Sequence, residues 1–317
     1  MSPRWSPSRQ TAKDAVKRVI PVLNRVTERA GVRLQPVHYY SEVPDRAWLR
    51  AHRATWARPL PLAGVDWDLD AQLAWVEKVS AQHLPEVVGL ADWRALGTEY
   101  GPGYGPIESQ LLHGVLRSLT PARLVEVGSG VSTVLAHRAV ARTVAEGGPR
   151  TAITCVEPYP RPALHALDGV RVVAHGAQEV DRAVFDQLEA GDVLFVDSTH
   201  AVRTGSELAR LYLEVLPGLA PGVLVHVHDV YLPYPYAPDV LESVFDWQET
   251  TLLAALLTHN RHLEVLAATS ALHHERSDGL RALFPDHRPR PMADGLDVDP
   301  DAASRGTFPS SLWLVTA

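Results

Sequence analysis

From Ala122 onward the chain alternates short apolar runs with helical stretches, and this alternation constrains the fold more than any other feature. The runs are rich in Val and Ile and mostly lack alternating polar residues, which is typical of strands buried on both faces of a parallel sheet. The sequence therefore predicts an α/β fold with a doubly wound, mostly parallel sheet. The first five runs are 123–127, 152–156, 170–174, 193–196 and 223–227, and the helical stretches between them are 132–145, 161–167, 180–190 and 206–216.

The two ends of the chain complete this expected architecture. Residues 238–257 are expected to form a long helix. The last two runs, 262–267 and 311–316, are expected to pair antiparallel at the sheet edge, which gives a seven-stranded sheet. The first third of the chain lacks such runs and is expected to be a helical N-terminal cap over residues 1–105, with the sheet domain over residues 106–317.

Composition excludes several classes of protein. The chain has 317 residues, a formal net charge of −7 and one cysteine, Cys155. The acidic balance argues against a nucleic-acid partner, and a single cysteine rules out an internal disulfide framework or a cysteine-based zinc cluster. No apolar run reaches the ~18 residues that a membrane span needs, and residues 1–10 lack the apolar core of a signal peptide. We therefore expect a cytoplasmic protein without a membrane partner.

A glycine turn, Glu126-Val127-Gly128-Ser129-Gly130, joins the first predicted strand to the following helix. Gly128 and Gly130 allow a sharp turn and the close approach of a ligand to the backbone. A dinucleotide fingerprint needs a third glycine, and Thr133 stands in its place. An acid before the turn suits a ligand with a cationic ammonium better than a pyrophosphate. A turn that binds nothing is the plain alternative.

An acid also follows the second predicted strand, in Val156-Glu157-Pro158. A carboxylate at this tip is placed to accept hydrogen bonds from both hydroxyls of a ribose. The two patterns together resemble class I S-adenosylmethionine-dependent methyltransferases (EC 2.1.1.-), which implies a Rossmann-like fold with S-adenosylmethionine as the cofactor. The cofactor-binding residues that the resemblance implies are Glu126, Gly128, Ser129, Gly130, Ser132, Glu157, Gln178 and Asp197.

Polar residues gather after the fourth and fifth predicted strands. Asp197 and His200 follow the fourth strand, and His228 and Asp229 follow the fifth. The carboxyl ends of parallel strands face one crevice, so these side chains are expected to converge. Carboxylates with an imidazole form a plausible site for a divalent cation, whereas solvated loop residues are the plain alternative. His226 lies deeper in its strand and is expected to be a core histidine.

This second arrangement resembles the metal-dependent small-molecule O-methyltransferases, a broad family that includes macrocin O-methyltransferases and cephalosporin-hydroxylase-like proteins. The resemblance covers roughly residues 101–317. It implies that Asp197, His228 and Asp229 hold a divalent metal (Mg, Mn or Fe), and that His200 acts beside Asp197 as the catalytic general base. His228 departs from the family pattern, because a hard oxygen ligand is usual there. An imidazole suits manganese, iron or zinc better than magnesium.

The acceptor side is expected at two aromatic loops. Residues 231–236, Tyr-Leu-Pro-Tyr-Pro-Tyr, follow the fifth strand and are expected to form a wall or lid of the crevice. Residues 100–106 form a Gly/Pro-rich loop before a predicted helix at 107–119. Packing against the N-terminal cap is the alternative for the 231–236 loop. The substrate-contacting candidates are Tyr104, Glu108, Tyr231 and Tyr234.

The sequence thus predicts S-adenosylmethionine-dependent methylation, with metal assistance, of a hydroxyl on a small-molecule acceptor such as a natural product or a sugar. One alternative is an iron-dependent oxygenase or hydroxylase on the same scaffold. Another is a non-catalytic cofactor-binding protein. An exposed aromatic N-terminal cap would suit a homodimer.

Overall fold

The computed structural model describes residues 19–36, 40–87, 93–101, 103–287, 292–297 and 308–317. It divides into two units, residues 1–56 and residues 57–317. In the first unit residues 19–27 are helical, and the chain continues through η1 (Glu28–Ala30), α2 (Arg46–Ala51) and α3 (Arg53–Trp56). The second unit contains the sheet and every candidate site residue, and the expected domain boundary at residue 105 stays a prediction. Among the described residues, no helix has the length and apolarity needed to cross a membrane.

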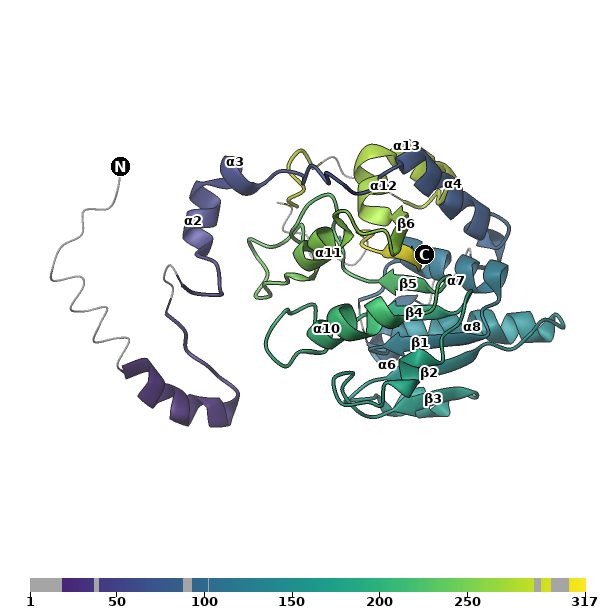
Figure 1. Cartoon of the computed structure of the whole chain (residues 1–317), viewed down its shortest axis with the longest axis horizontal. Coiled ribbons are helices and arrows are strands. Elements are labelled where there is room, and N and C mark those ends of the chain that lie inside the picture. The colour runs from purple at the N-terminus through teal and green to yellow at the C-terminus, as the bar shows by residue number, and fades with distance from the viewer. Residues whose placement is uncertain (1–18, 37–39, 88–92, 102, 288–291, 298–307) are drawn as a thin grey trace. The chain divides into compact units, whose positions relative to one another are not determined.

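A seven-stranded sheet in the order β3-β2-β1-β4-β5-β7-β6 forms the centre of the second unit. The ladders among the first five strands are parallel, and β7 lies antiparallel between β5 and β6 (Figure 1). The predicted doubly wound sheet and its antiparallel edge pair are therefore confirmed. The strands are β1 (Arg123–Val127), β2 (Ala152–Val156), β3 (Val170–Val173), β4 (Val193–Val196), β5 (Leu224–Val227), β6 (Leu263–Ala268) and β7 (Leu312–Thr316).

Helices connect the strands, and the one at 238–257 is shorter than the sequence predicts. Only α11 (Glu249–Leu257) is helical there. Residues before it form turns, in which the amides of Glu242 and Ser243 both donate to the carbonyl of Asp239. The other helices of this unit are α4 (Leu69–Ser80), α5 (Leu84–Val87), α6 (Trp93–Tyr100), α7 (Pro106–Leu119), α8 (Val131–Ala145), α9 (Ala183–Asp186), α10 (Glu207–Arg210), α12 (Thr269–Glu275) and α13 (Ser277–Leu283), with short turns η2 (Pro162–Ala166), η3 (Leu211–Val215, a π-helix) and η4 (Leu216–Gly218).

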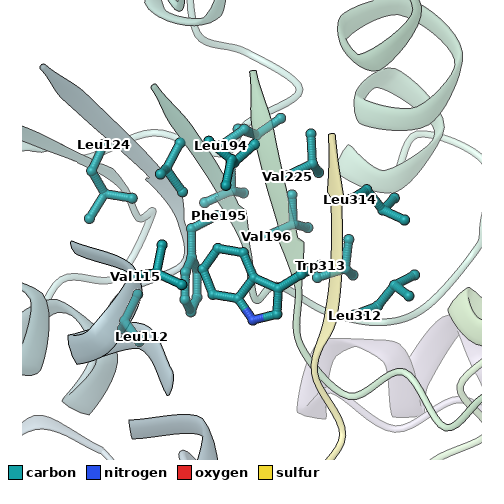
Figure 2. Packing of buried hydrophobic residues seen from close by; sticks show 14 of the residues in the cluster. Leu112, Val115, Leu124, Leu194, Phe195, Val196, Val225, Leu312, Trp313 and Leu314 are labelled. Carbon is teal, nitrogen blue, oxygen red and sulfur yellow. The ribbon is translucent and has the colours of Figure 1, made fainter. Parts of the chain in front are cut away.

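A row of large side chains crosses one face of the sheet. Phe195 of β4, His226 of β5 and Trp313 of β7 are register partners, and their rings are in contact. Figure 2 shows Phe195 and Trp313 on the side of the sheet that faces Leu112 and Val115 of α7. This packing holds the carboxyl ends of β4 and β5 in a fixed relation to α7.

His226 is a core residue, as the sequence predicts. Its side chain is fully buried, and its Nε2 lies 2.9 Å from Oγ of Ser311. Burial lowers the pKa of the imidazole to about 3, so His226 is neutral at physiological pH. It belongs to the packed row rather than to the crevice.

Candidate functional site

The glycine turn ties three strand tips together. Gly128 has φ +97°, and a Cβ at this position would lie 1.9 Å from the carbonyl oxygen of Asp197. The amide of Gly128 donates to the carbonyl of Val156, and the amide of Asp197 donates to the carbonyl of Val127, each at 2.9 Å. Only glycine fits such an approach, so the turn after β1 lies directly against the tip of β4.

Glu126 stabilises the turn from inside the protein. Its carboxylate accepts hydrogen bonds from Ser132 Oγ at 2.5 Å, Thr133 Oγ1 at 2.7 Å and Cys155 Sγ at 3.3 Å. Burial raises the pKa of Glu126 to about 7, although these hydrogen bonds oppose the shift. The carboxylate thus joins β1 to the first turn of α8, and Thr133 contributes a hydroxyl where a dinucleotide fingerprint has glycine.

Glu157 stands at the tip of β2 and is half-buried. Ser129 Oγ donates to its Oε2 at 3.3 Å, and the amide of Tyr159 donates to its Oε1 at 2.7 Å. Gln178 is exposed beyond β3, with its amide over Gly176. An accessible carboxylate held at a strand tip, beside a turn without bulky side chains, fits the donor hydroxyls of a nucleoside ribose.

Four side chains converge where β4 and β5 end. Asp197 Oδ1 lies 3.4 Å from His200 Nε2 and 3.3 Å from His228 Nδ1. Asp229 Oδ2 lies 3.7 Å from His200 Nε2 and 3.8 Å from His228 Nδ1. The structure thus brings together all four residues that the sequence singles out at these tips. One atom each from Asp197, His200 and His228 lies within 4.8 Å of the others, as ligands of one metal ion would.

Each imidazole of this cluster contacts a second, buried carboxylate through its other nitrogen. His200 Nδ1 lies 2.7 Å from Glu249 Oε2, and His228 Nε2 lies 3.2 Å from Glu108 Oε2. Glu249 is the first residue of α11, and the hydroxyl of Tyr212 donates to its other oxygen. These outer contacts fix the ring orientation of both histidines.

The carboxylates set the protonation of the cluster. Burial alone would lower the pKa of His200, but hydrogen bonds to Asp197 and Glu249 outweigh it and raise the pKa to about 10. His228 follows the same pattern, with a pKa raised well above its usual value by surrounding carboxylates. Burial would raise the pKa of Asp197, yet the two imidazoles hold it below its usual range. Without a bound ion, both imidazoles are therefore protonated and Asp197 is ionised at neutral pH.

Two residues of the cluster have a left-handed backbone conformation. His200 has φ +55° and Asp229 has φ +54°. Such conformations cost about 1–3 kcal/mol outside glycine and persist where the surrounding structure enforces them, commonly at functional sites. In this conformation the side chains of His200 and Asp229 approach each other within the cluster.

A pocket of about 480 Å³ opens beside the cluster. Its volume lies within the range of pockets that bind small molecules. Asp229 belongs to its wall, and Trp247, another wall residue, contacts the ring of His200 with centroids 4.7 Å apart. The aromatic and acidic wall residues are Tyr231, Phe245, Trp247, Phe308, Asp229, Asp239, Glu242 and Asp297.

The four predicted acceptor contacts are not placed alike. Tyr231 lines the pocket and donates its hydroxyl to Asp229 Oδ1 at 2.8 Å. Glu108 lies behind His228, where Ser310 and Ser311 also donate to it, and Tyr104 packs against the His228 ring. Tyr234 contacts Tyr236 and His274 away from the pocket wall. Of the four, Tyr231 is the one that faces the pocket.

Glu249 and Trp247 were not indicated by the sequence. An acid at the start of an apolar helix is ordinarily a favourable partner of the helix dipole, so Glu249 gave no functional signal. Trp247 falls within the stretch predicted to be helical. Their contact with His200 depends on the packing of α11 beside the tip of β4, which no local pattern encodes.

Comparison with known proteins provides one informative match. A family model described as a methyltransferase domain matches residues 125–230, which contain the glycine turn, Glu157 and the whole cluster of strand tips. A search of curated proteins finds no match.

Among solved structures, the chain is similar to the O-methyltransferase TomG from Streptomyces achromogenes, involved in tomaymycin synthesis and in complex with SAM, at 16% identity and a TM-score of 0.37 over 63% of this chain and 82% of that chain. It is also similar to an O-methyltransferase from Bacillus cereus in complex with SAH, at 15% identity and a TM-score of 0.37 over 61% of this chain and 87% of that chain. Similarity at these TM-scores carries no functional argument, so the family match stands on its own.

Proposed function

We propose that this chain, whose residues 125–230 match a methyltransferase domain, is an S-adenosylmethionine-dependent methyltransferase that methylates an oxygen of a small-molecule acceptor bound in the pocket beside the β4 and β5 tips. S-adenosylmethionine would lie across the tips of β1 and β2, with its ribose on Glu157. The cluster after β4 and β5 would receive the acceptor hydroxyl. Residues 1–105 are proposed to form a helical cap and residues 106–317 the catalytic domain.

The contact between Gly128 and Asp197 carries this proposal. Methyl transfer requires the acceptor oxygen, the methyl carbon and the sulfur to be nearly in line, and such positioning alone contributes up to roughly 7–11 kcal/mol in ideal cases. The missing side chain at Gly128 lets the cofactor turn touch the backbone of Asp197, where a Cβ would approach to 1.9 Å. Donor and acceptor sites are therefore adjacent across a single backbone contact.

The reaction needs little covalent chemistry from the protein. The acceptor oxygen forms a bond to the methyl carbon, and the carbon–sulfur bond breaks with its electron pair going to sulfur. The hydroxyl proton passes to a carboxylate of the cluster. His200, which the sequence predicts as the base, is already protonated in the ion-free site and could accept this proton only in its neutral form. A divalent ion in this cluster, for which the sequence predicts Asp197, His228 and Asp229 as ligands, would lower the pKa of the acceptor hydroxyl.

The pocket wall supports a small organic acceptor. Tyr231, Phe245, Trp247 and Phe308 offer flat apolar surfaces, and Asp229 supplies a polar group at the end that adjoins the cluster. Binding pockets for small molecules commonly combine such apolar walls with a few placed polar groups.

Transfer of an isotopically labelled methyl group tests the proposal. The protein is incubated with labelled S-adenosylmethionine and a panel of hydroxylated aromatic and sugar-bearing small molecules, and labelled products are located by NMR. The proposal predicts that the labelled methyl group is found on an oxygen of the product. Asp229→Ala should abolish this methyl transfer, whereas S-adenosylmethionine should still bind. Label on nitrogen or carbon, or label transfer unaffected by Asp229→Ala, would contradict it.

A further inference from the structure

We propose that Asp197, His200 and His228 form a two-histidine, one-carboxylate site for a transition-metal ion, in which Glu249 and Glu108 orient the two imidazoles. This inference rests on the proposed function only in that it concerns the same cluster. It places His200, instead of Asp229, as the third ligand beside Asp197 and His228. It also selects the class of ion and gives two buried glutamates a role as positioning residues.

The inner and outer contacts of His200 differ in length, whereas those of His228 are nearly equal at 3.3 and 3.2 Å. The outer contact of His200, from Nδ1 to Glu249, is 2.7 Å, which is typical of a charge-assisted hydrogen bond. The inner contacts of Asp197 Oδ1 with His200 and His228 are 3.4 and 3.3 Å. For metal–ligand distances of about 2.1 Å, neighbouring ligands of a four- or six-coordinate ion lie about 3.0–3.4 Å apart. These two distances therefore fit edges of a coordination shell, and the third, between a nitrogen of His200 and one of His228, is within 4.8 Å.

The outer carboxylates select the tautomers that metal binding needs. When His200 is neutral, as a metal ligand must be, its remaining proton on Nδ1 is donated to Glu249, and the lone pair on Nε2 faces the cluster. A proton on His228 Nε2 is donated to Glu108, which leaves a lone pair on Nδ1 facing the same point. Metal-binding histidines almost always donate their second nitrogen in this way, and loss of such a partner typically weakens binding 10- to 100-fold.

The balance of charge also favours a cation. Glu108 and Glu249 are nearly inaccessible, with side-chain exposures of 2% and 1%, and Asp197 and Asp229 are 29% and 20% exposed. Within the described part of the chain, no lysine or arginine forms a salt bridge with any of these four carboxylates. Even two protonated imidazoles leave an excess of negative charge, which is costly to bury unless it is paired. A divalent ion would offset this excess.

The ligand atoms indicate which ions fit. Mg²⁺ prefers oxygen ligands and an octahedral shell with several waters, whereas imidazole nitrogen suits zinc and iron. Two nitrogens and one carboxylate oxygen face this centre, so the site should prefer a transition-metal ion to Mg²⁺. His200 then contributes a lone pair to the ion, and Asp229, which lines the pocket, is the carboxylate left beside the acceptor.

Calorimetric titration of the chelator-treated full chain with Zn²⁺ and with Mg²⁺ tests the site. We expect one Zn²⁺ per chain, bound at least tenfold more tightly than Mg²⁺. His200→Ala and His228→Ala should each weaken Zn²⁺ binding tenfold or more, and Glu249→Gln and Glu108→Gln by about 10- to 100-fold. His165→Ala, at an exposed histidine far along the chain from the cluster, is the matched control and should bind Zn²⁺ as the unaltered protein does.

A spectroscopic readout separates ligation from folding. With Cu²⁺ as a spin probe, electron paramagnetic resonance should resolve coupling to two nitrogens in the unaltered protein and to one in His200→Ala. Equal affinity for Zn²⁺ and Mg²⁺, no binding of either ion, or unchanged nitrogen coupling in His200→Ala would overturn the inference. Binding of S-adenosylhomocysteine is measured on the same samples. Cofactor binding without metal binding defeats this inference alone, and metal binding without cofactor binding defeats the proposed function.

Discussion

Two regions of this protein each bury a carboxylate beneath the strand tips, and the pKa values of the two carboxylates shift in opposite directions. Glu126, beneath the cofactor turn, is surrounded by hydroxyls and a thiol, and burial raises its pKa to about 7. Glu108, beneath the acceptor cluster, is just as buried, but the imidazole of His228 outweighs burial and lowers its pKa. The two carboxylates differ in their partners rather than in their depth.

Under the proposed function, this difference gives the two regions separate roles. Neutral donors around Glu126 join β1 to α8 without requiring a charge, so the turn is a rigid support for a bound nucleoside. The acceptor cluster instead concentrates ionised groups around one point, as a site that moves a proton or holds a cation needs. Substitutions in the two regions should therefore separate cofactor binding from turnover.

The largest effect is expected at the acceptor cluster. Asp229→Ala removes the carboxylate that joins the cluster to the pocket, and should lower kcat by about 10²- to 10⁴-fold, the range typical of a lost proton-transfer group. The affinity for S-adenosylmethionine should stay within about threefold by calorimetry. Asp286→Ala, at an exposed aspartate, is the control. Loss of S-adenosylmethionine binding in Asp229→Ala would mean that cofactor binding and turnover are not separated between the two regions.

Glu126 should make stability depend on pH. Its folded-state pKa of about 7 lies above the ordinary value of 4.5, so the folded protein binds more protons than the unfolded chain between these values. The free energy of unfolding should therefore decrease as pH rises from 4.5 to 7, by roughly 3 kcal/mol from this residue. Glu126→Gln should remove that decrease in urea titrations, whereas Glu264→Gln, at an exposed glutamate, should retain it. Identical pH profiles for Glu126→Gln and the unaltered protein would contradict this account.

The cofactor side should show a smaller and purely binding effect. Glu157→Ala deletes the carboxylate that would accept hydrogen bonds from the ribose, and should weaken S-adenosylmethionine binding about 10- to 100-fold. Zn²⁺ binding at the cluster should not change. Glu214→Ala, at an exposed glutamate, provides the comparison. Unchanged affinity for S-adenosylmethionine in Glu157→Ala would mean that Glu157 does not bind the ribose.

A pair of glycines measures the contact between the regions. Gly128 and Gly147 both have positive φ, but a Cβ at Gly128 meets the backbone of Asp197, whereas one at Gly147 meets open space. Gly147→Ala should show only the conformational cost, about 1 kcal/mol. Gly128→Ala should lose about 1–3 kcal/mol more in chemical unfolding, because the backbone must shift. Equal losses would mean that the turn does not depend on this approach.

The sequence predicted what local patterns encode. Valine-rich runs between helical stretches predicted the strands. The polar residues that follow these strands within a few positions were the predicted site residues, namely Glu157, Asp197, His200, His228 and Asp229. Residues 238–248, the first part of the helix predicted at 238–257, form turns and irregular structure instead and supply part of the pocket wall.

The contacts of the two histidines with the buried glutamates could not be predicted from the sequence. Glu249 meets His200 from 49 residues away, and Glu108 meets His228 from 120 residues away. Both contacts arise from how helices pack beside strand tips, which depends on the whole core rather than on spacing along the chain. Glu108 was singled out for the acceptor side, and its contact with His228 is visible only in three dimensions.

Calorimetric titration of the unaltered chain with S-adenosylhomocysteine, alongside a nicotinamide dinucleotide, tests the central claim most directly. The account predicts saturable heat with one S-adenosylhomocysteine per chain and none with the dinucleotide. Heat from the dinucleotide alone would contradict it.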